Sequence, residues 1–181
     1  MLSVMPTFIF SWRLIDYMGT IFYVYLGQDD PKKSTMKKLE RYGLAIQIPL
    51  SKIYNKLYLT PYSDSFLINS HRKLFEEKGL VVVDGSWNRI NTIENLKGKN
   101  GKKLPLLLPV NPVNYGKPGK LSSLEALAAA LYIMGYSELA ENVISKYSWA
   151  QNFIKTNIEP LNDYMKCTCD SDCIRVQGYY F

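Results

Sequence analysis

The stretch LVVVDGSW, residues 80–87, gives the clearest indication of the fold. Its apolar, β-branched run predicts a buried strand over Leu80–Asp84. Asp84 stands at the carboxyl end of this strand, a glycine–serine turn follows, and Trp87 comes next. Ligands of open α/β sheets bind outside the carboxyl ends of the strands. An acid and an indole here therefore predict a ligand cleft, although an Asp that caps a loop and a Trp of the core would give the same pattern.

Strand and helix patterns alternate around this stretch, which favours an α/β fold. Apolar runs predict further strands over residues 20–26, 44–50, 56–60 and 104–109. Periodicity and capping residues predict helices over residues 34–42, 64–78, 124–134, 137–147 and 149–158. We expect the first, second, third and fifth of these helices to end at Gly43, Gly79, Gly135 and Pro160, respectively. Ser122 with Glu125 fits a capping box, Ser137 is expected to cap the next helix, and residues 98–103 resemble a linker.

The composition is that of an ordinary globular protein. The chain has 181 residues, of which 47% are hydrophobic and 21% are charged, so it suits one compact domain or one domain with a small lobe. These values exclude collagen and a disordered chain. The formal net charge of +6 raises the expectation of a polyanionic partner only modestly.

Basic residues are concentrated in two segments. Residues 31–56 contain seven Lys or Arg and one acid, Glu40, and residues 97–120 contain six Lys and no acid. Both segments adjoin loops that are rich in Gly and Pro. A surface that faces phosphates and a plain solvated surface explain this pattern equally well.

Residues 7–26 form the one stretch that could be taken for a membrane span. Arg13 and Asp16 lie near its centre, and each would cost about 3 kcal/mol in a bilayer core on insertion scales. No Lys or Arg precedes the apolar run, so a signal peptide fits poorly as well. We therefore expect a soluble, cytoplasmic protein that makes no membrane contact.

Metal, disulfide and histidine chemistry are not expected. The three cysteines, Cys167, Cys169 and Cys173, form one cluster at the tail, and an odd count is no disulfide framework. A zinc site needs a fourth ligand, and the only histidine, His71, is far away in the sequence. A frayed, reduced tail is the default expectation. His71 is expected to be solvated rather than catalytic.

Two further segments could carry a site. In DPKKSTMKKL, residues 30–39, a turn leads into a helix start that Ser34 or Thr35 can cap. Such a start suits a carboxylate, but a plain basic helix has the same sequence. Residues 104–125 place a long loop rich in Pro, Gly and Asn between two buried elements. Such loops seldom serve packing alone, and their backbones can present N–H and C=O groups to a flat heterocycle.

Four blocks of the sequence occur in a distinctive order: DPKKSTMKKL at 30–39, VVVDGSW at 81–87, LPLLLPVNPVNYGKPGKLSSLEALAAAL at 104–131 and KYSWAQNFIKTN at 146–157. Together they resemble the small-subunit ribosomal-RNA aminocarboxypropyltransferase family, which acts in ribosome biogenesis in archaea and eukaryotes. The resemblance covers roughly residues 20–165 and leaves out the leader and the cysteine tail.

The resemblance implies an N-terminal α/β lobe joined to a C-terminal lobe like that of SPOUT RNA methyltransferases, with a deep trefoil knot. The expected division is a leader over 1–19, the α/β lobe over 20–79, the SPOUT-like lobe over 80–165 and a tail over 166–181. It also implies transfer of the 3-amino-3-carboxypropyl group of S-adenosylmethionine to N3 of a hypermodified pseudouridine in small-subunit rRNA. Methylthioadenosine would be the by-product, and the prolines and charged helix faces suggest a monomer.

The implied pocket binds S-adenosylmethionine through a few residues. The backbones of Leu104 and Gly119 would contact the adenine edge, and the Val83 carbonyl would accept the ribose hydroxyls. Thr35 and Ser123 would hold the amino-acid end.

The remaining implied residues control the reaction itself. Trp87, helped by Ile90, would enclose the methyl group of the sulfonium, because an indole is an apolar wall whose π face tolerates positive charge. Asp84 would remove the N3 proton or orient the cofactor. Gly85 and Gly119 depart from the family, in which a cysteine and a larger side chain are common there.

Basic residues around the first predicted helix and after Trp87 would contact RNA phosphates: Lys32, Lys33, Lys37, Lys38, Arg41 and Arg89. A target base would have to be splayed out, and Tyr115 could stack on it or serve the loop structurally. Two other functions remain open from the residues: a knotted rRNA methyltransferase that uses the same cofactor, and a non-catalytic RNA-binding assembly factor.

Overall fold

The structure is a computed structural model that describes residues 19–28, 34–86 and 93–181. The expected leader over residues 1–19 lies outside this range except for Gly19. No helix within the described residues is long and apolar enough to cross a membrane.

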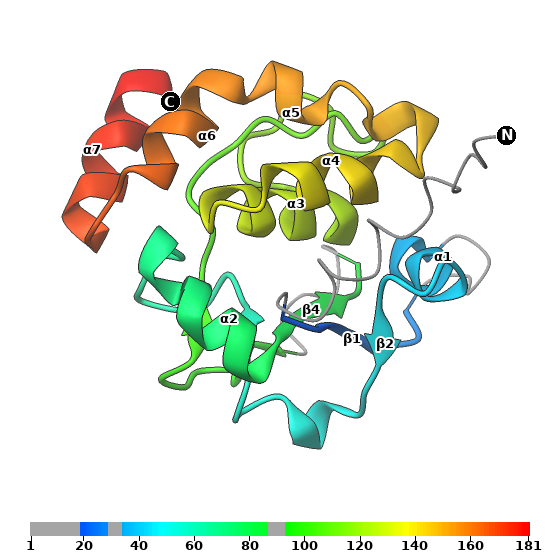
Figure 1. The fold of residues 1–181 in the computed structure, drawn as a ribbon. Coiled ribbons are helices and arrows are strands. Elements are labelled where there is room, and N and C mark those ends of the chain that lie inside the picture. Colours follow the sequence, from blue (N-terminus) through cyan, green and yellow to red (C-terminus); the bar gives the residue numbers. More distant parts are fainter. Residues whose placement is uncertain (1–18, 29–33, 87–92) are drawn as a thin grey trace, which may run out of the picture.

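One parallel sheet forms the centre of the fold (Figure 1). Its five strands lie in the order β2-β1-β4-β3-β5. Their bounds are β1 (Ile21–Tyr25), β2 (Ile46–Gln47), β3 (Leu57–Leu59), β4 (Leu80–Asp84) and β5 (Gly101–Lys102). β1 and β4 pair along their whole length, from Ile21 opposite Leu80 to Tyr25 opposite Asp84. The predicted α/β class is confirmed, and the strands come from both sides of the expected boundary at residue 79.

Alternate residues of the central strands point to opposite faces of the sheet, and both faces are covered. On one face, Ile21, Tyr23, Leu80 and Val82 join the main core with residues of α1 (Thr35–Arg41), α2 (Arg72–Lys78) and α3 (Ser123–Ile133). On the other face, Val24 and Val81 pack with Ile53, Ile93 and Leu96. The two-sided burial explains why β4 consists almost entirely of apolar residues.

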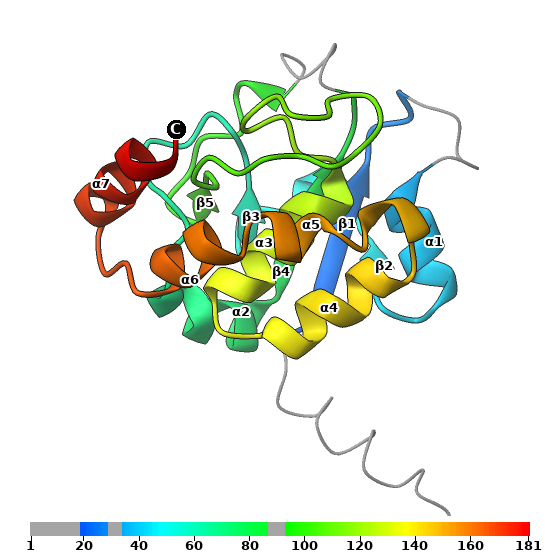
Figure 2. The same ribbon diagram turned by 90° about the horizontal axis from the view of Figure 1, so that it is seen from above.

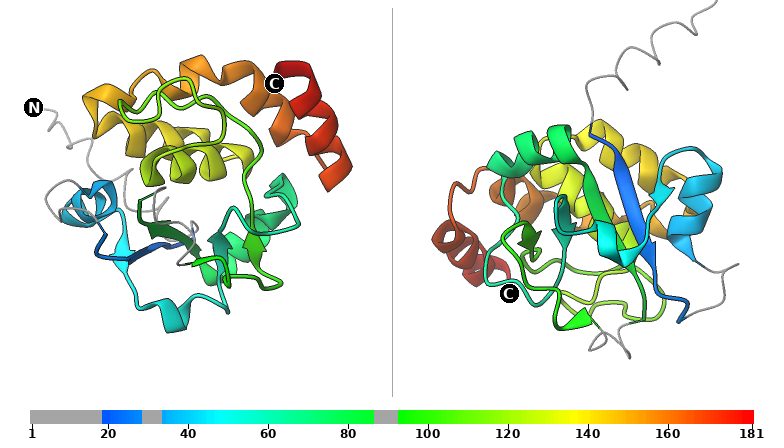
Figure 3. Two further views of the ribbon diagram at one scale, coloured as in Figure 1. Left: turned by 180° about the vertical axis from the view of Figure 1, so that it is seen from behind. Right: turned by 90° about the horizontal axis from the view of Figure 1, so that it is seen from below.

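The C-terminal part of the chain is helical, as predicted. After α3 come α4 (Ser137–Ser145), α5 (Phe153–Thr156), α6 (Ile158–Met165) and α7 (Asp170–Tyr180). Short 3₁₀ turns lie at Leu50–Lys52, Asn69–His71 and Ser148–Ala150. α3 and α4 lie over the sheet, and α5, α6 and α7 lie on their outer side (Figures 1 and 2). Seen from below, the strands stand in front of α3 and α4 (Figure 3). The Ala-rich α3 is buried on nearly all sides because it lies between these layers.

The strand expected over residues 104–109 is wrong. The segment is buried at alternate positions, but it pairs with no other strand of the described residues. The N–H groups of Leu106 and Leu108 bond to side chains, and the carbonyls of Leu107 and Pro109 accept from the backbone of a nearby loop. The last strand is β5 instead, within the stretch taken for a linker. The strand expected over residues 44–50 is limited to Ile46–Gln47.

Three helix predictions need correction. Residues 64–68 are not helical, because the N–H groups of Phe66 and Leu67 bond to the Asp170 side chain and the Lys103 carbonyl. Pro160 does not end a helix over 149–158 but lies in the first turn of α6, where proline costs no intrahelical hydrogen bond. Ser137 begins α4 rather than capping it.

The expectation of a frayed tail is also wrong. Residues 170–180 form α7, which packs against α6. Cys173 is fully buried and Cys167 is nearly so, so these cysteines belong to the core. Tyr180 also donates a hydrogen bond to Asp163 of α6 over 2.7 Å. An apolar side chain at every third or fourth position therefore orders the tail as a helix.

Candidate active site

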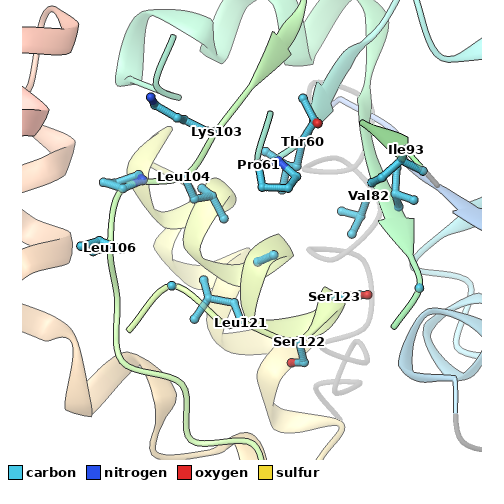
Figure 4. A pocket seen from close by; sticks show the side chains of 16 residues that line it. Thr60, Pro61, Val82, Ile93, Lys103, Leu104, Leu106, Leu121, Ser122 and Ser123 are labelled. Carbon is cyan, nitrogen blue, oxygen red and sulfur yellow. The ribbon is translucent and has the colours of Figure 1, made fainter. Parts of the chain in front are cut away.

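A cavity of about 240 Å³ lies where three parallel strands end (Figure 4). Thr60 follows β3, Val83 belongs to the end of β4, and Lys103 follows β5, and all three line the cavity. Residues 104–106 and 119–123 complete most of the wall. In Figure 4, Thr60 and Val82 face Ser122 and Ser123 across this space. The cavity thus lies at the carboxyl edge of the sheet, where ligands of open α/β sheets bind.

A buried carboxylate fixes one wall of the cavity. Glu125 of α3 has no exposed surface and accepts five hydrogen bonds, at 2.7 to 3.0 Å. The donors are the N–H groups of Val110, Asn111 and Ser122, the Asn111 amide and the Ser122 hydroxyl. The Ser122 hydroxyl also accepts from the Glu125 N–H, which completes the predicted capping box. Glu125 therefore ties the 110–111 loop to the start of α3.

Side chains of the C-terminal helices fix the opposite end of the same segment. Gln177 of α7 accepts a hydrogen bond from the Leu106 N–H over 2.8 Å, and Tyr164 of α6 donates to the Leu106 carbonyl over 3.1 Å. Asn157 bonds both backbone groups of Leu108. The wall that carries Leu104 and Leu106 is thus held in place by the tail.

Four of the predicted cofactor-binding residues come together in this cavity: Val83, Leu104, Gly119 and Ser123. No hydrogen bond within the described part of the chain engages the Ser123 hydroxyl. Gly119 has a φ of +78°, and a Cβ there would lie 2.9 Å from Leu106 Cδ2. Only glycine therefore leaves this part of the cavity open without strain.

The lining suits the S-adenosylmethionine that the resemblance implies. The walls are mainly aliphatic, which suits an adenosyl group. The hydroxyls of Thr60 and Ser123 add polar groups. The residues of this cavity therefore fit the group.

Asp84 stands at the end of β4, beside the cavity rather than in its lining. The Ser34 hydroxyl donates a hydrogen bond of 2.5 Å to Asp84 Oδ2. The same hydroxyl accepts from the Lys37 N–H over 3.1 Å, so Ser34 is the N-cap of α1. Thr35 is the first residue of α1, and it too lies outside the cavity lining.

The charge of the Asp84 carboxylate acts on two tyrosines. Tyr147, after α4, donates a hydrogen bond of 2.6 Å to the Thr35 carbonyl. Burial and, next, the charge of Asp84 raise the pKa of Tyr147. Burial, a hydrogen bond to Glu40 and also the Asp84 charge raise the pKa of Tyr23 on β1. Both hydroxyls therefore stay protonated at neutral pH.

The lysines predicted to bind RNA differ in their surroundings. Lys38 donates to the Lys146 carbonyl over 3.0 Å and lies 4.3 Å from the centre of the Tyr147 ring, so it fastens α1 to the end of α4. Lys37 lies 4.1 Å from the centre of the Tyr25 ring, and Arg41 is exposed. The other residues predicted at the site lie outside the described residues: Lys32, Lys33, Trp87, Arg89 and Ile90.

The sequence reasoning missed several residues of this region. Thr60 and Lys103 follow strands, and the strand-end argument applied to Asp84 could have found Thr60. Lys103 was not considered, because it belongs to residues 98–103, which resemble a linker. The role of Ser34 beside Asp84 has no local signal, because the two residues are 50 positions apart. His71 is half-buried, and its Nδ1 accepts from the Ile68 N–H over 3.1 Å, so it serves the local turn.

Comparison with known proteins identifies close relatives. Residues 57–181 match a family model described as "Ribosome biogenesis protein, C-terminal". The 16S rRNA aminocarboxypropyltransferase of Thermoplasma volcanium is 52% identical over 165 residues, covering 91% of this chain and 99% of that protein. The 18S rRNA aminocarboxypropyltransferase of Saccharomyces cerevisiae is 35% identical over 145 residues, covering 78% of this chain and 46% of that protein.

A solved structure has the same fold. The SAM-dependent rRNA:acp-transferase Tsr3 from Vulcanisaeta distributa matches with a TM-score of 0.78 and 33% sequence identity. The match covers 90% of this chain and 97% of that one. It agrees with the mixed α/β fold and the parallel sheet described above.

Proposed function

Because this chain belongs to the family of small-subunit rRNA aminocarboxypropyltransferases, we infer that it transfers the 3-amino-3-carboxypropyl group of S-adenosylmethionine to ribosomal RNA in ribosome biogenesis. The resemblance read from the four sequence blocks is thereby confirmed. The cavity at the ends of β3, β4 and β5 carries the structural part of this conclusion, since it gathers four of the residues that the resemblance assigned to the cofactor.

Within that function, the acceptor we propose is N3 of a pseudouridine, in its N1-methylated form, in small-subunit rRNA. N3 carries a proton and is a weak nucleophile until that proton leaves. Asp84 is the residue we assign to its removal, and the position of Asp84 beside Val83 at the carboxyl edge supports this role. When bound, S-adenosylmethionine supplies an electrophilic γ-carbon, and transfer leaves methylthioadenosine.

The chain's own residues would select which carbon reacts. Backbone groups of Leu104 and Gly119 would contact the adenine, and the Val83 carbonyl would accept from the ribose. Ser123 and Thr35 would hold the amino-acid end, and the Ser123 hydroxyl, which has no hydrogen-bond partner among the described residues, supports the first of these roles. Trp87 and Ile90 would cover the methyl group. The aliphatic lining would keep water from the reacting carbon.

The RNA would bind next to this cavity by its phosphates. Lys37 and Arg41 on α1 and the acid-free segment 97–120 support this placement, with Lys32, Lys33, Lys38 and Arg89 as the other proposed contacts. Phosphate contacts of this kind make affinity fall steeply with salt. We further propose a SPOUT-like lobe over 80–165 with a deep trefoil knot, a monomer, and a cytoplasmic location. The side-chain anchoring of Leu106 to α6 and α7 is compatible with such a lobe.

The deciding experiment uses S-adenosylmethionine labelled in its carboxyl carbon together with small-subunit rRNA. We expect label in the RNA and release of methylthioadenosine, and Asp84→Asn should slow the transfer. Glu138→Gln is the matched control, because Glu138 is exposed on α4. An RNA that gains only a methyl group would identify a methyltransferase. Retained rRNA binding without cofactor binding would identify an assembly factor.

A further inference from the structure

The Ser34 hydroxyl forms hydrogen bonds with two partners that lie on different elements. It donates to Asp84 Oδ2 over 2.5 Å and accepts from the Lys37 N–H over 3.1 Å. A serine hydroxyl carries a single proton, so the whole donor capacity of Ser34 is spent on the Asp84 carboxylate. Ser34 is only 7% exposed, which leaves little room for water to replace this bond.

Capping alone does not account for this arrangement. An N-cap side chain has only to accept from the free N–H groups of the helix, and its replacement by glycine costs little stability. The bond from Ser34 to Lys37 meets that need. The second bond runs to a carboxylate at the end of β4, and a hydrogen bond to a charged group is shorter and stronger than one between neutral groups.

Other contacts fasten the helix that begins after Ser34. The Tyr147 hydroxyl bonds the carbonyl of Thr35, and Lys38 Nζ bonds the carbonyl of Lys146. Both contacts fasten α1 to the chain after α4. A hydroxyl at the start of a fastened helix can fix the direction of a carboxylate that faces it.

We propose that Ser34 is a positioning residue for the transfer reaction, which holds the Asp84 carboxylate in the orientation in which it acts on the acceptor base. This inference rests on the role of Asp84 in the proposed function. The charge of this carboxylate also acts on Tyr23 of β1 and on Tyr147, and Lys37 and Lys38 lie on the same helix as Ser34. Within this group, Ser34 is the residue whose hydroxyl bonds both Asp84 and the helix start.

The test compares Ser34→Gly, Ser34→Ala, Asp84→Asn and the double variant Ser34→Ala/Asp84→Asn. Ser34→Gly removes the donor but keeps a residue that tolerates the N-cap position, so its melting temperature should fall less than that of Ser34→Ala. Transfer to small-subunit rRNA is measured in single turnover with both substrates saturating. Affinity for S-adenosylmethionine is measured separately by calorimetry.

We expect Ser34→Gly and Ser34→Ala to slow the transfer step roughly tenfold or more, with little change in cofactor affinity. In the Asp84→Asn background, Ser34→Ala should change the rate by no more than about twofold, since residues that act through one another are not additive. Wild-type transfer by Ser34→Gly would overturn the inference, as would a full further loss in the double variant. If Asp84→Asn itself reacts at the wild-type rate, the proposed role of Asp84 is wrong and the positioning role falls with it. If only Asp84→Asn is slow, the positioning role alone is wrong.

Discussion

The side-chain amide of Asn157 hydrogen-bonds both backbone groups of Leu108, as a neighbouring strand would. Asn157 Oδ1 accepts from the Leu108 N–H over 2.8 Å, and Asn157 Nδ2 donates to the Leu108 carbonyl over 2.9 Å. The same amide also donates to the Phe153 carbonyl over 3.0 Å, and Asn157 has no exposed surface. One buried side chain thus satisfies both backbone groups of Leu108, in an extended segment that has no strand partner within the described residues.

Replacing Asn157 by Leu should destabilise the protein. Each buried backbone group that loses its partner costs about 1 to 3 kcal/mol, and this change leaves at least the N–H and carbonyl of Leu108 unpaired. Urea denaturation should show a lower free energy of unfolding. Asn152→Leu is the matched control, because Asn152 is exposed. An equal loss in the two variants would contradict this role for Asn157.

Glu125→Gln tests the buried carboxylate that links the 110–111 loop to the start of α3. Glutamine keeps the shape of the side chain, but it turns one acceptor into a donor that faces other donors. Hydrogen bonds to a charged group are worth about 1.5 to 3 kcal/mol each, so the free energy of unfolding should fall by at least about 3 kcal/mol. The same denaturation experiment measures it, with Glu138→Gln as the exposed control. A variant as stable as that control would show that Glu125 does not hold the loop.

The elements whose structure depends on residues close by in the sequence could be predicted from the sequence. β4 has the predicted bounds because its apolar run fits a sheet buried on both sides, and Ser122 with Glu125 forms the predicted capping box. The segment 104–109 could not be assigned, because an apolar run specifies burial but not the partner. Its partners, Asn157, Tyr164 and Gln177, lie 49 to 71 residues further along the chain.

The candidate site, too, could be predicted only in part. The strand-end rule pointed to Asp84, and the family resemblance supplied Val83 and Ser123 of the cavity wall. Neither source could show that Ser34 bonds Asp84 across 50 positions, since that contact exists only after β1, α1 and β4 are assembled. The cysteine tail was misjudged because its spacing was examined for metal and disulfide chemistry rather than for a helix with a buried face.

Trp87→Ala should cripple cofactor binding if the indole covers the methyl group of the sulfonium. The affinity for S-adenosylmethionine is expected to fall by more than tenfold, since a cation over an indole in a desolvated site contributes roughly 2 kcal/mol. Calorimetry measures this directly, and Trp87→Phe should lose less than Trp87→Ala because it keeps an aromatic face. Unchanged affinity in the alanine variant would remove Trp87 from the pocket.

The cysteines should react unequally with iodoacetamide at pH 8. Burial raises the pKa of Cys173 and of Cys167, which lowers the thiolate fraction of both, and their burial also blocks the reagent. Cys169 is exposed. Mass spectrometry of the native protein should therefore find alkylation at Cys169 alone, and denaturant should release the other two. Rapid native labelling of Cys173 would mean that α7 opens readily.

Gln177→Leu should weaken binding of S-adenosylmethionine although Gln177 lies on the last helix and outside the cavity lining. Its carbonyl oxygen holds the N–H of Leu106, which lines the cavity, so the substitution leaves that N–H unpaired and frees the wall to shift. If the misplaced wall loses about 1.4 kcal/mol of interaction, the dissociation constant rises tenfold. The transfer rate at saturating cofactor should change little, because Asp84 and Ser34 lie on other elements. Gln151→Leu, at an exposed position after α4, should leave the affinity unchanged. Equal affinities of the two variants would show that the C-terminal helix does not support the pocket.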